Sequence, residues 1–441
     1  IQDELHLISG PLGTIVGLYE TAIDRLCSRG DRVHKVVAST ATIRRAKEQC
    51  ENLYHRETFE FPPQGIRAGD SYFAEEDTKS PGRLYVGFMG TAVKSHQTAL
   101  VRACSTLLQG ACYDPETDPS EHQEIADPYG TLVWYFNSLR ELGHAATLST
   151  GDIPEFLKGL CHRLGVPPKL RRYVREIIEL TSRRNADEIP EILQQLEMPW
   201  RMGGKGRQPV DILLATNMIA VGVDVSRLGL LLMSGQPKST SEYIQATSRV
   251  GRLHPGLVVT VYTQTKSRDR SHYERFIAYH QSLYKHVEPT SVTPFSPQAR
   301  DRGMRGVLVA LGRLLAGADT PDKLPNVEAK VEEEIDFILR RIGGFDEIKG
   351  IDPDEKDEAA EELRNFVAAW KKLLPQEYGK MGGNVTTTTL CYPFGSSPDP
   401  VFQRDSWPIM TSMRNVDGSC TAQVLNTYEV EDQDADGEVL T

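Results

Sequence analysis

The hydrophobic pattern changes character twice along this chain. Between about residues 83 and 265, short apolar runs alternate with segments of helical periodicity, whereas mainly helical segments follow residue 265, with irregular structure or short strands expected at 380–415. Several short runs are apolar at every position, such as "LGLLLM" at 228–233, which is typical of parallel strands covered on both faces. The pattern predicts an α/β region built on a parallel sheet, followed by a mostly helical region.

The apolar runs define the strands that we expect in this sheet. They are 83–89, 131–136, 145–150, 177–182, 211–216, 228–234 and 257–263, and the clearest helices between them are 92–109, 187–197 and 240–250. The basic stretch that opens with "KLRRYVRE" at 169 is expected to form a salt-bridged surface helix.

The flanking regions complete a prediction of four parts. A helix at 11–30, a buried strand at 33–40 and a helix at 43–54 have the rhythm of a second α/β domain, and 55–82 is rich in Pro, Gly and charge. We therefore expect 1–54 to be the end of a first domain, 55–82 a linker and 83–265 a second, complete domain. Residues 266–441 are expected to be an accessory region, mostly helical and with an acidic tail.

Composition narrows the class of protein. A chain of 441 residues is too long for one typical core, which agrees with two or three compact units. The net charge of -11 argues against a uniformly basic nucleic-acid coat but leaves room for a local basic groove. The 7 cysteines form no Cys-x-x-Cys pair, and no apolar run is long enough to span a membrane, so we expect a reduced, cytoplasmic protein away from membranes.

Two short motifs near the start carry candidate chemistry. In "DELH", Asp3 would bind Mg²⁺ while Glu4 polarises a water for attack on a phosphate, although an exposed acidic pair is the simpler interpretation of four residues. In "ASTAT" at 38–42, small hydroxyl residues follow a predicted strand, where α/β sheets build sites. Capping of the next helix is the alternative for Thr42.

Two more motifs lie in the second α/β region. In "ATNMIAVGVD" at 215–224, Thr216 and Asn217 are candidate phosphate donors, Gly222 allows close approach of a ligand, and Asp224 is a candidate acceptor from a sugar hydroxyl. In "YIQATSRVGR" at 243–252, two arginines three residues apart are expected to point the same way from one helix and its end. Such a pair suits a triphosphate, whereas two surface arginines on an amphipathic helix are the alternative.

The order of these motifs resembles that of motifs II, III, V and VI in superfamily 2 helicases of the DExH type. The stretch "TLVWYFNSLRELG" at 131–143 also looks like motif IV of that family, so the resemblance covers about 1–263. It implies tandem RecA-like parallel-sheet domains, the first incomplete and the second complete, that hydrolyse ATP with Mg²⁺ in the cleft between them. Motif VI usually has Gly at the position of Ser248, and a small residue is retained here.

The resemblance assigns roles residue by residue. Asp3 would bind Mg²⁺ and Glu4 would orient the attacking water, with Arg249, Arg252 and Gln245 completing the catalytic set. The other nucleotide-binding residues would be His6, Gly222 and Asp224, and the residues that couple nucleotide state to domain closure would be Ser39, Thr40 and Thr42. Nucleic-acid contacts would come from Asn137, Ser138, Ser182, Arg183, Arg184, Thr216 and Asn217, where a solvated loop is the alternative for the two arginines.

A narrower resemblance lies after motif VI. Residues 267–306 and "WPIMTSMRNVDGSC" at 407–420 are similar in phrase order to the helicase subunit of DISARM, a bacterial anti-phage defence system. This resemblance implies an ATP-dependent translocase on DNA, single-stranded or containing a junction, that works with a second, DrmB-like subunit.

One motif of the family is missing from the sequence. No Gly-x-x-x-x-Gly-Lys-Thr phosphate loop precedes "DELH", so we expect the chain to be the C-terminal portion of a longer protein, with its partner domain upstream. By itself the chain is expected neither to bind ATP well nor to hydrolyse it. Two alternatives stay open: a DNA-repair helicase of the same superfamily, which the absence of Cys-x-x-Cys disfavours, and a non-catalytic scaffold that clamps nucleic acid.

Overall fold

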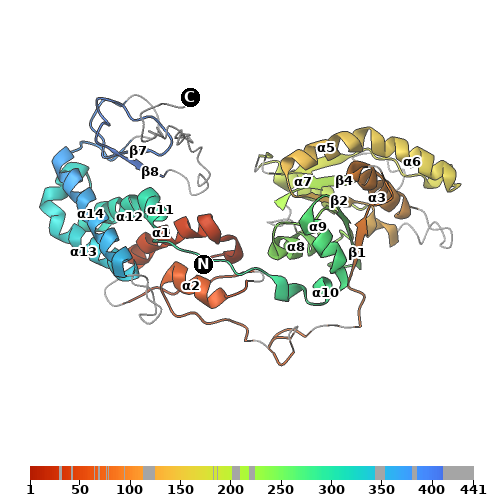
Figure 1. Ribbon diagram of the computed structural model, residues 1–441, viewed down its shortest axis with the longest axis horizontal. Coiled ribbons are helices and arrows are strands. Elements are labelled where there is room, and N and C mark those ends of the chain that lie inside the picture. Colours follow the sequence, from red (N-terminus) through yellow and green to blue (C-terminus); the bar gives the residue numbers. More distant parts are fainter. Residues whose placement is uncertain are drawn as a thin grey trace, which may run out of the picture. The chain divides into compact units, whose positions relative to one another are not determined.

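The computed structural model divides the chain into two compact units (Figure 1). Unit 1 comprises 1–40, 45–60 and 290–441, and unit 2 comprises 41–44 and 61–289. The structure describes residues 1–28, 32–40, 43–63, 65–67, 70–75, 77, 79–93, 95–112, 125–181, 183–185, 187–200, 209–217, 224–342, 353–379 and 385–410. The first residues and the C-terminal helices, which the sequence placed in separate parts, thus share one unit.

Unit 2 is built on a six-stranded parallel sheet with the strand order β1-β6-β5-β2-β4-β3. The strands are β1 (Arg83–Met89), β2 (Leu132–Phe136), β3 (Ile177–Leu180), β4 (Ile212–Ala215), β5 (Leu230–Ser234) and β6 (Gly256–Tyr262). The predicted fold class, a parallel-sheet α/β fold followed by a helical C-terminal region, is confirmed.

Helices cover both faces of this sheet, as the runs of apolar residues required. Trp134 and Leu232 face the core shared with α3 (His96–Gly110), α5 (Leu139–Thr150) and α6 (Asp152–Arg163). Tyr135 and Met233, one position along each strand, face the core shared with α7 (Ile189–Glu197) and α8 (Thr240–Thr247). Alternate side chains of a strand point to opposite faces, so every position of β2 and β5 is buried.

Two sequence predictions in this unit are wrong. Residues 145–150 form the second half of α5 and not a strand, because Leu142, Ala145 and Ser149 share the buried side of a helix. The stretch 169–180 is not a surface helix: it begins in a short 3-10 segment (Pro168–Leu170), continues without regular structure and ends in β3. Its Arg172 is buried, 2.7 Å from the Asp211 carboxylate and with its guanidinium 4.1 Å from the centre of the Trp200 ring.

Unit 2 continues past the last strand to residue 289. The added elements are α9 (Ser267–Glu274), α10 (Phe276–Gln281) and the 3-10 turn η5 (Leu283–His286). The Tyr243 hydroxyl lies 2.8 Å from His280 Nε2, and the Glu288 carboxylate accepts from the Thr240 N–H at the start of α8. Through these contacts, His280 and Glu288 hold the segment that follows the sheet against α8, the helix that precedes the predicted arginine pair.

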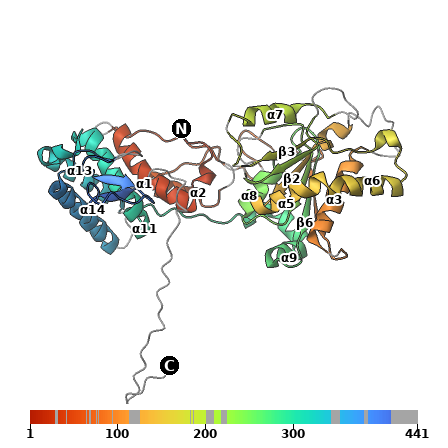
Figure 2. The same cartoon turned by 90° about the horizontal axis from the view of Figure 1, so that it is seen from above.

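Unit 1 is mainly helical, and α1 (Gly10–Cys27) is central to it. Figure 2 shows α1 beside α2 (Ala46–Tyr54) and the C-terminal helices. Ile15, Leu18 and Ala22 of α1 enter one core with the C-terminal region. That region contains α11 (Pro297–Ala299), α12 (Arg305–Leu311), α13 (Leu324–Ile342), α14 (Pro353–Leu373) and the parallel pair β7 (Cys391–Pro393) and β8 (Trp407–Ile409).

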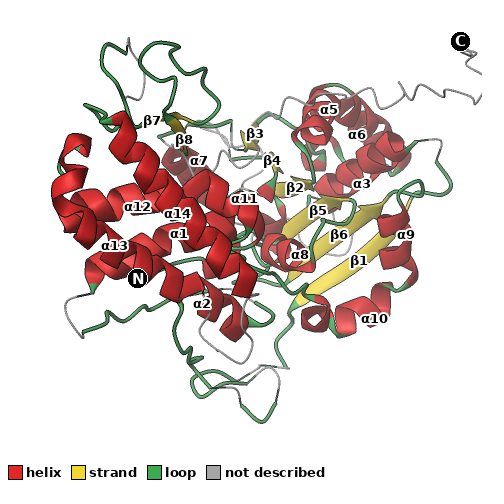
Figure 3. Cartoon of the chain, turned by 60° about the vertical axis from the view of Figure 1, so that its left-hand side comes forward, coloured by secondary structure: helices red, strands yellow, loops and turns green. Residues whose placement is uncertain are grey.

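Short 3-10 and π segments complete the described elements. The 3-10 segments are η1 (Leu5–Leu7), η2 (Asp127–Tyr129), η3 (Pro168–Leu170), η5 and η8 (Pro321–Lys323), and the π segments are η6 (Arg300–Met304) and η7 (Gly312–Ala316). The predicted buried strand at 33–40 is not formed: most of this stretch is exposed, and Ala38 pairs with Gln2 through an isolated parallel bridge. In Figure 3 the labelled strands β7 and β8 of this unit are yellow and its labelled helices are red.

A buried ion-pair cluster joins α1 to the C-terminal helices. Asp24 of α1 lies 2.5 Å from Arg341 of α13 and also pairs with Arg56, while Arg341 donates to the carbonyls of Leu53 and Tyr54. The side chain of Arg341 is only 4% exposed. Loss of one partner from such a cluster leaves an unpaired buried charge.

We expect Asp24→Ala to lower the free energy of unfolding of unit 1 by about 3–5 kcal/mol. Urea unfolding, with a probe specific to the unit 1 transition, measures this change. Glu328→Ala is the matched control, because its exposed pair with Lys371 is worth less than about 1 kcal/mol. Equal effects of the two substitutions would show that the Asp24 cluster does not hold the unit together.

Candidate functional site

The acidic motif forms a tight, hydrogen-bonded loop in unit 1. Ser39 donates its hydroxyl to Asp3 Oδ1, and the Glu4 N–H donates to the same oxygen at 2.9 Å. The backbone of Ser39 also bonds that of Gln2 and Leu5, at 2.8 and 3.0 Å. Motifs II and III of the predicted site are therefore in direct contact through Asp3 and Ser39.

The environment of Asp3 keeps its carboxylate ionised. The hydrogen bond from Ser39, followed by that from the Glu4 N–H, lowers the pKa of Asp3 below its ordinary value. Glu4 has a left-handed backbone, with φ 52° and ψ 45°, and its carboxylate lies 3.4 Å from His6 Nδ1. The loop presents an exposed anion at Asp3 and a second carboxylate beside it.

The side chain of Gln49 supports the acidic loop through hydrogen bonds, a role that the sequence did not predict. Its side chain is buried, donates to the carbonyl of Ile8 at 2.7 Å and accepts from the Thr290 hydroxyl at 2.8 Å. Gln49 therefore ties the end of the acidic loop to the segment where the chain enters the C-terminal region. No motif marks such a residue, because two of its contacts are to backbone carbonyls.

In unit 2, the predicted arginine pair lies in a turn. Helix α8 ends at Thr247, so Arg249 and Arg252 both follow the helix, and the expectation that helical spacing aligns them is wrong. Gly251 between them has φ +74°, and its N–H donates to the Leu228 carbonyl at 2.8 Å. The direction of the two guanidinium groups is set by this turn and not by helical periodicity.

Close packing explains the glycine in this arginine turn, residues 249–252. A Cβ on Gly251 would lie 2.8 Å from the Cα of Gly256, where β6 begins. Arg83, at the start of β1, donates to the carbonyl of Val250 at 2.6 Å. Arg83 is a second supporting residue that the sequence did not reveal, since its partner is a carbonyl more than a hundred positions away.

Motifs V and VI meet at the arginine turn. The guanidinium of Arg252 pairs with the carboxylate of Asp224, whose side chain is 70% exposed. Gln245 lies half-buried on the last turns of α8, and Arg249 is also half-buried. The structure thus brings Asp224 of motif V into contact with Arg252 of motif VI.

The predicted nucleic-acid residues of unit 2 follow the carboxyl ends of the strands. Because all six strands are parallel, these ends share one edge of the sheet, and the arginine turn lies at the opposite edge, where β5, β6 and β1 begin. The described residues at the carboxyl edge are Asn137, Ser138, Arg183, Arg184, Thr216 and Asn217. The sheet therefore separates the two groups of candidate residues.

Several residues at the carboxyl edge have partners within the unit. Asn137 Nδ2 donates to the carbonyl of Ser234 at 3.0 Å, and Ser138 caps α5 by accepting from the Glu141 N–H. Arg184 pairs with Glu188 at 2.9 Å. Thr216 is buried next to the exposed Asn217. Thr42, Ser182 and Gly222 lie outside the described residues.

The described side chains fit a magnesium-bound nucleotide in their chemistry. Mg²⁺ is commonly held by one or two carboxylates together with substrate phosphates, and Asp3 supplies an exposed carboxylate of lowered pKa. Within the described ranges, no cluster of three or more His, Cys, Asp or Glu side chains is arranged to hold a metal ion. Asp3 is thus the residue that would hold Mg²⁺, and the arginine turn supplies guanidinium groups of the kind that bind phosphate oxygens.

Comparisons with known proteins agree with these motifs. Residues 168–254 match the helicase conserved C-terminal domain, a stretch that contains β3, β4, β5, α8 and the arginine turn. The chain is 42% identical over 379 residues to the DISARM protein DrmA of Bacillus paralicheniformis. That alignment covers 84% of this chain and 32% of the relative, so the chain spans about a third of the relative's length. The predicted resemblance to helicases and to the helicase subunit of DISARM is confirmed.

Solved structures with a similar chain course are also helicases. The DUF1998 helicase MrfA bound to DNA is 18% identical, with a TM-score of 0.48 over 70% of this chain and 37% of that one. The helicase Lhr of Mycobacterium smegmatis, bound to ssDNA and AMP-PNP, is 13% identical, with a TM-score of 0.44 over 85% of this chain and 38% of that one.

Among the described residues, every helix is too short or too polar to cross a membrane.

We expect Ser39→Ala to raise the pKa of Asp3 toward its ordinary value of 3.8, because the largest stabilising contact of the carboxylate is removed. An NMR titration of the side-chain carboxyl carbons measures this. Because the pKa in the folded state is depressed, the stabilisation is present above the unfolded pKa and lost as pH falls through the folded one. Thr40→Ala is the control, and an unchanged Asp3 pKa in Ser39→Ala would contradict the assigned contact.

Proposed function

We propose that this chain is part of an ATP-dependent DNA translocase that acts in the bacterial cytoplasm in defence against phage, as a helicase subunit of the DISARM type. The observation that carries the proposal is the contact between the acidic motif and Ser39, which holds an ionised Asp3 beside Glu4. The 42% identity to a DISARM protein supports the choice of system.

In the proposed reaction, unit 1 supplies the acids. Asp3 would hold Mg²⁺, which when bound would supply charge neutralisation to the phosphates, and Glu4 would orient the attacking water. The ion pair between His6 and Glu4 restrains the Glu4 carboxylate. The hydrogen bond from Ser39 favours the ionised form of Asp3. Ser39, Thr40 and Thr42 are proposed to couple nucleotide state to domain closure.

Unit 2 supplies the cationic half of the proposed site. Arg249 and Arg252 stabilise charge on the transferred phosphoryl group, and Gln245 helps to hold the nucleotide, with Gly222 and Asp224 facing it. In the described structure, Arg252 is already paired with Asp224. Nucleotide binding is therefore proposed to exchange this exposed ion pair for a contact with phosphate, which makes the arginine responsive to the nucleotide.

DNA is proposed to lie along the carboxyl edge of the sheet of unit 2. Hydroxyl, amide and guanidinium groups are usual donors to the phosphates of nucleic acids, and this edge carries them at Ser138, Asn137, Thr216, Asn217, Arg183 and Arg184. Ser182 is a further candidate from the sequence alone. A single strand or a junction is the proposed substrate. A second, DrmB-like subunit is the proposed partner in the defence system.

The test measures DNA-stimulated ATP hydrolysis by the protein as its gene encodes it. We expect Glu4→Gln to reduce kcat by roughly 10²–10⁴-fold with DNA affinity unchanged, because an oriented general base contributes about this much. Arg249→Ala should give a loss of similar or greater size.

Glu48→Gln, which changes an exposed acid on α2, is the matched control and should behave as wild type. Full hydrolysis by Glu4→Gln would contradict the role of the acidic loop. A protein that neither binds DNA nor hydrolyses ATP would contradict the function as a whole.

A further inference from the structure

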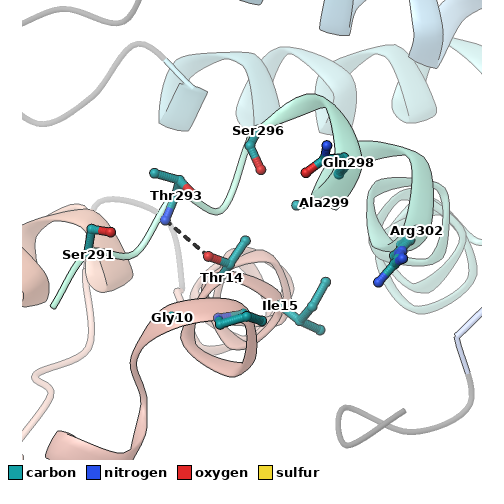
Figure 4. Close-up of a pocket in the computed structure, with 10 residues that line it drawn as sticks. Gly10, Thr14, Ile15, Ser291, Thr293, Ser296, Gln298, Ala299 and Arg302 are labelled. Carbon is teal, nitrogen blue, oxygen red and sulfur yellow. Dashed lines mark hydrogen bonds between the residues drawn. The ribbon is translucent and has the colours of Figure 1, made fainter. Parts of the chain in front are cut away.

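A polar cavity lies in unit 1, next to the first turns of α1. Its volume is about 410 Å³, more than ten times the ~30 Å³ share of a water molecule in the liquid. Figure 4 shows that one wall comes from the start of α1 and the other from the segment 291–302. The lining residues are Gly10, Pro11, Thr14, Ile15, Ser291, Thr293, Ser296, Gln298, Ala299 and Arg302.

The lining has the chemistry of an anion site. It contains the guanidinium of Arg302, the amide of Gln298 and the hydroxyls of Thr14, Ser291, Thr293 and Ser296, but none of the lining residues is Asp or Glu. The chain as a whole has a net charge of -11, so an acid-free cavity with a cation differs from its average surface. Guanidinium, amide and hydroxyl groups are the side chains that most often donate to nucleic-acid phosphates.

The first turn of α1 adds positive potential to the same cavity. This helix has 18 residues, its first turn contains no acidic side chain, and Ser9 at the N-cap makes no side-chain cap bond. The Ser9 hydroxyl lies instead 3.4 Å from the His6 carbonyl. A Cβ placed on Gly10 meets no atom within 4 Å, so the space over this turn is open. The helix dipole therefore acts on the cavity without a competing carboxylate.

Both walls are held in place by hydrogen bonds. The Thr293 N–H donates to Thr14 Oγ1 at 3.2 Å (Figure 4), and the Gly10 N–H donates to the Ser291 carbonyl at 3.1 Å. Next to them, Thr290 donates to the buried Gln49, which also supports the acidic loop. The two walls of the cavity are thus arranged before any ligand binds, which reduces the entropic cost of binding.

We propose that this cavity binds the phosphodiester backbone of single-stranded DNA. The proposal rests on the DNA-binding function argued above and adds a contact outside the motifs of the helicase family. The volume accommodates a phosphate with the sugars on either side of it, and the lining offers donors and no acceptor charge. A strand held here is bound by the helix that follows the acidic loop.

Fluorescence anisotropy with a labelled single-stranded oligonucleotide tests this in the protein as its gene encodes it. Thr14→Glu places a carboxylate in the cavity, and Thr14→Gln is its neutral match in size. We expect Thr14→Glu to bind at least tenfold more weakly than Thr14→Gln. An abasic oligonucleotide should show the same ratio, because the proposed contact is with the backbone.

Arg302 is tested by its effect on salt dependence. Arg302→Gln should weaken binding and reduce the slope of log K against log salt by about 0.7, the value for one phosphate contact on a single strand. Arg340→Gln removes an equal charge from an exposed position of α13 and should leave the slope unchanged. Circular dichroism confirms that each variant is folded.

The possible outcomes separate the two proposals. If the wild-type chain binds no DNA, the proposed function and the cavity both fail. If it binds DNA but Thr14→Glu matches Thr14→Gln and Arg302→Gln matches Arg340→Gln, the cavity proposal alone is overturned. A Thr14→Glu effect that disappears with the abasic strand would also overturn it, since the contact would then be with bases.

Discussion

The buried guanidinium of Arg341 is the contact on which unit 1 depends. Arg341, on α13, pairs with Asp24 of α1 and donates to the carbonyls of Leu53 and Tyr54 at the end of α2. Separating the first residues of the chain from its C-terminal helices would therefore leave a buried charge unpaired or expose it to solvent. Helix α1 begins a few residues after the acidic loop and also forms one wall of the polar cavity. Fixing α1 therefore fixes the support of both candidate sites.

The sheet of unit 2 imposes a different constraint. All its strands are parallel, so loops after the strands gather at one edge and loops before them gather at the other. Helix α8 returns the chain from the carboxyl edge to the arginine turn, where Gly251 lets it pass close to Gly256. The proposed DNA contacts and the proposed phosphate contacts therefore lie at opposite edges of one sheet.

The sequence predicted most strands of the sheet because successive residues, which point to opposite faces of the sheet, are both apolar, as in β2 and β5. It failed at 145–150, where small and hydroxyl residues carry no strong period and packing of Leu142 and Ala145 against the sheet decides for helix. The prediction of a buried strand at 33–40 was wrong. A β-branched run becomes a buried strand where neighbouring strands pair with it on both edges, and here the pairing is an isolated bridge to Gln2.

The candidate site was predicted where short motifs mark it. The motifs named the acids, Ser39 and the arginines as candidates, whose roles stay predictions, and the structure brings Asp3 and Ser39 into contact. Gln49 and Arg83 could not be found, since both act through distant backbone carbonyls that only the folded chain brings near. The prediction that a helix aligns the two arginines is wrong, because α8 ends before both of them and the chain turns at Gly251. Gly251 has a positive φ, which glycine permits but which cannot be read from the sequence.

The central claim is that the acids of unit 1 and the arginines of unit 2 act on the same ATP. Pulsed electron-electron resonance between spin labels at Lys158 and Lys372, exposed positions of units 2 and 1, tests it most directly after Cys27 and Cys420 are replaced by Ser. In the protein as its gene encodes it, a non-hydrolysable ATP analogue with DNA should shift and narrow the distance distribution, and Arg249→Ala with Arg252→Ala should abolish that change. An unchanged distribution, or a shift that survives without both arginines, would contradict the account.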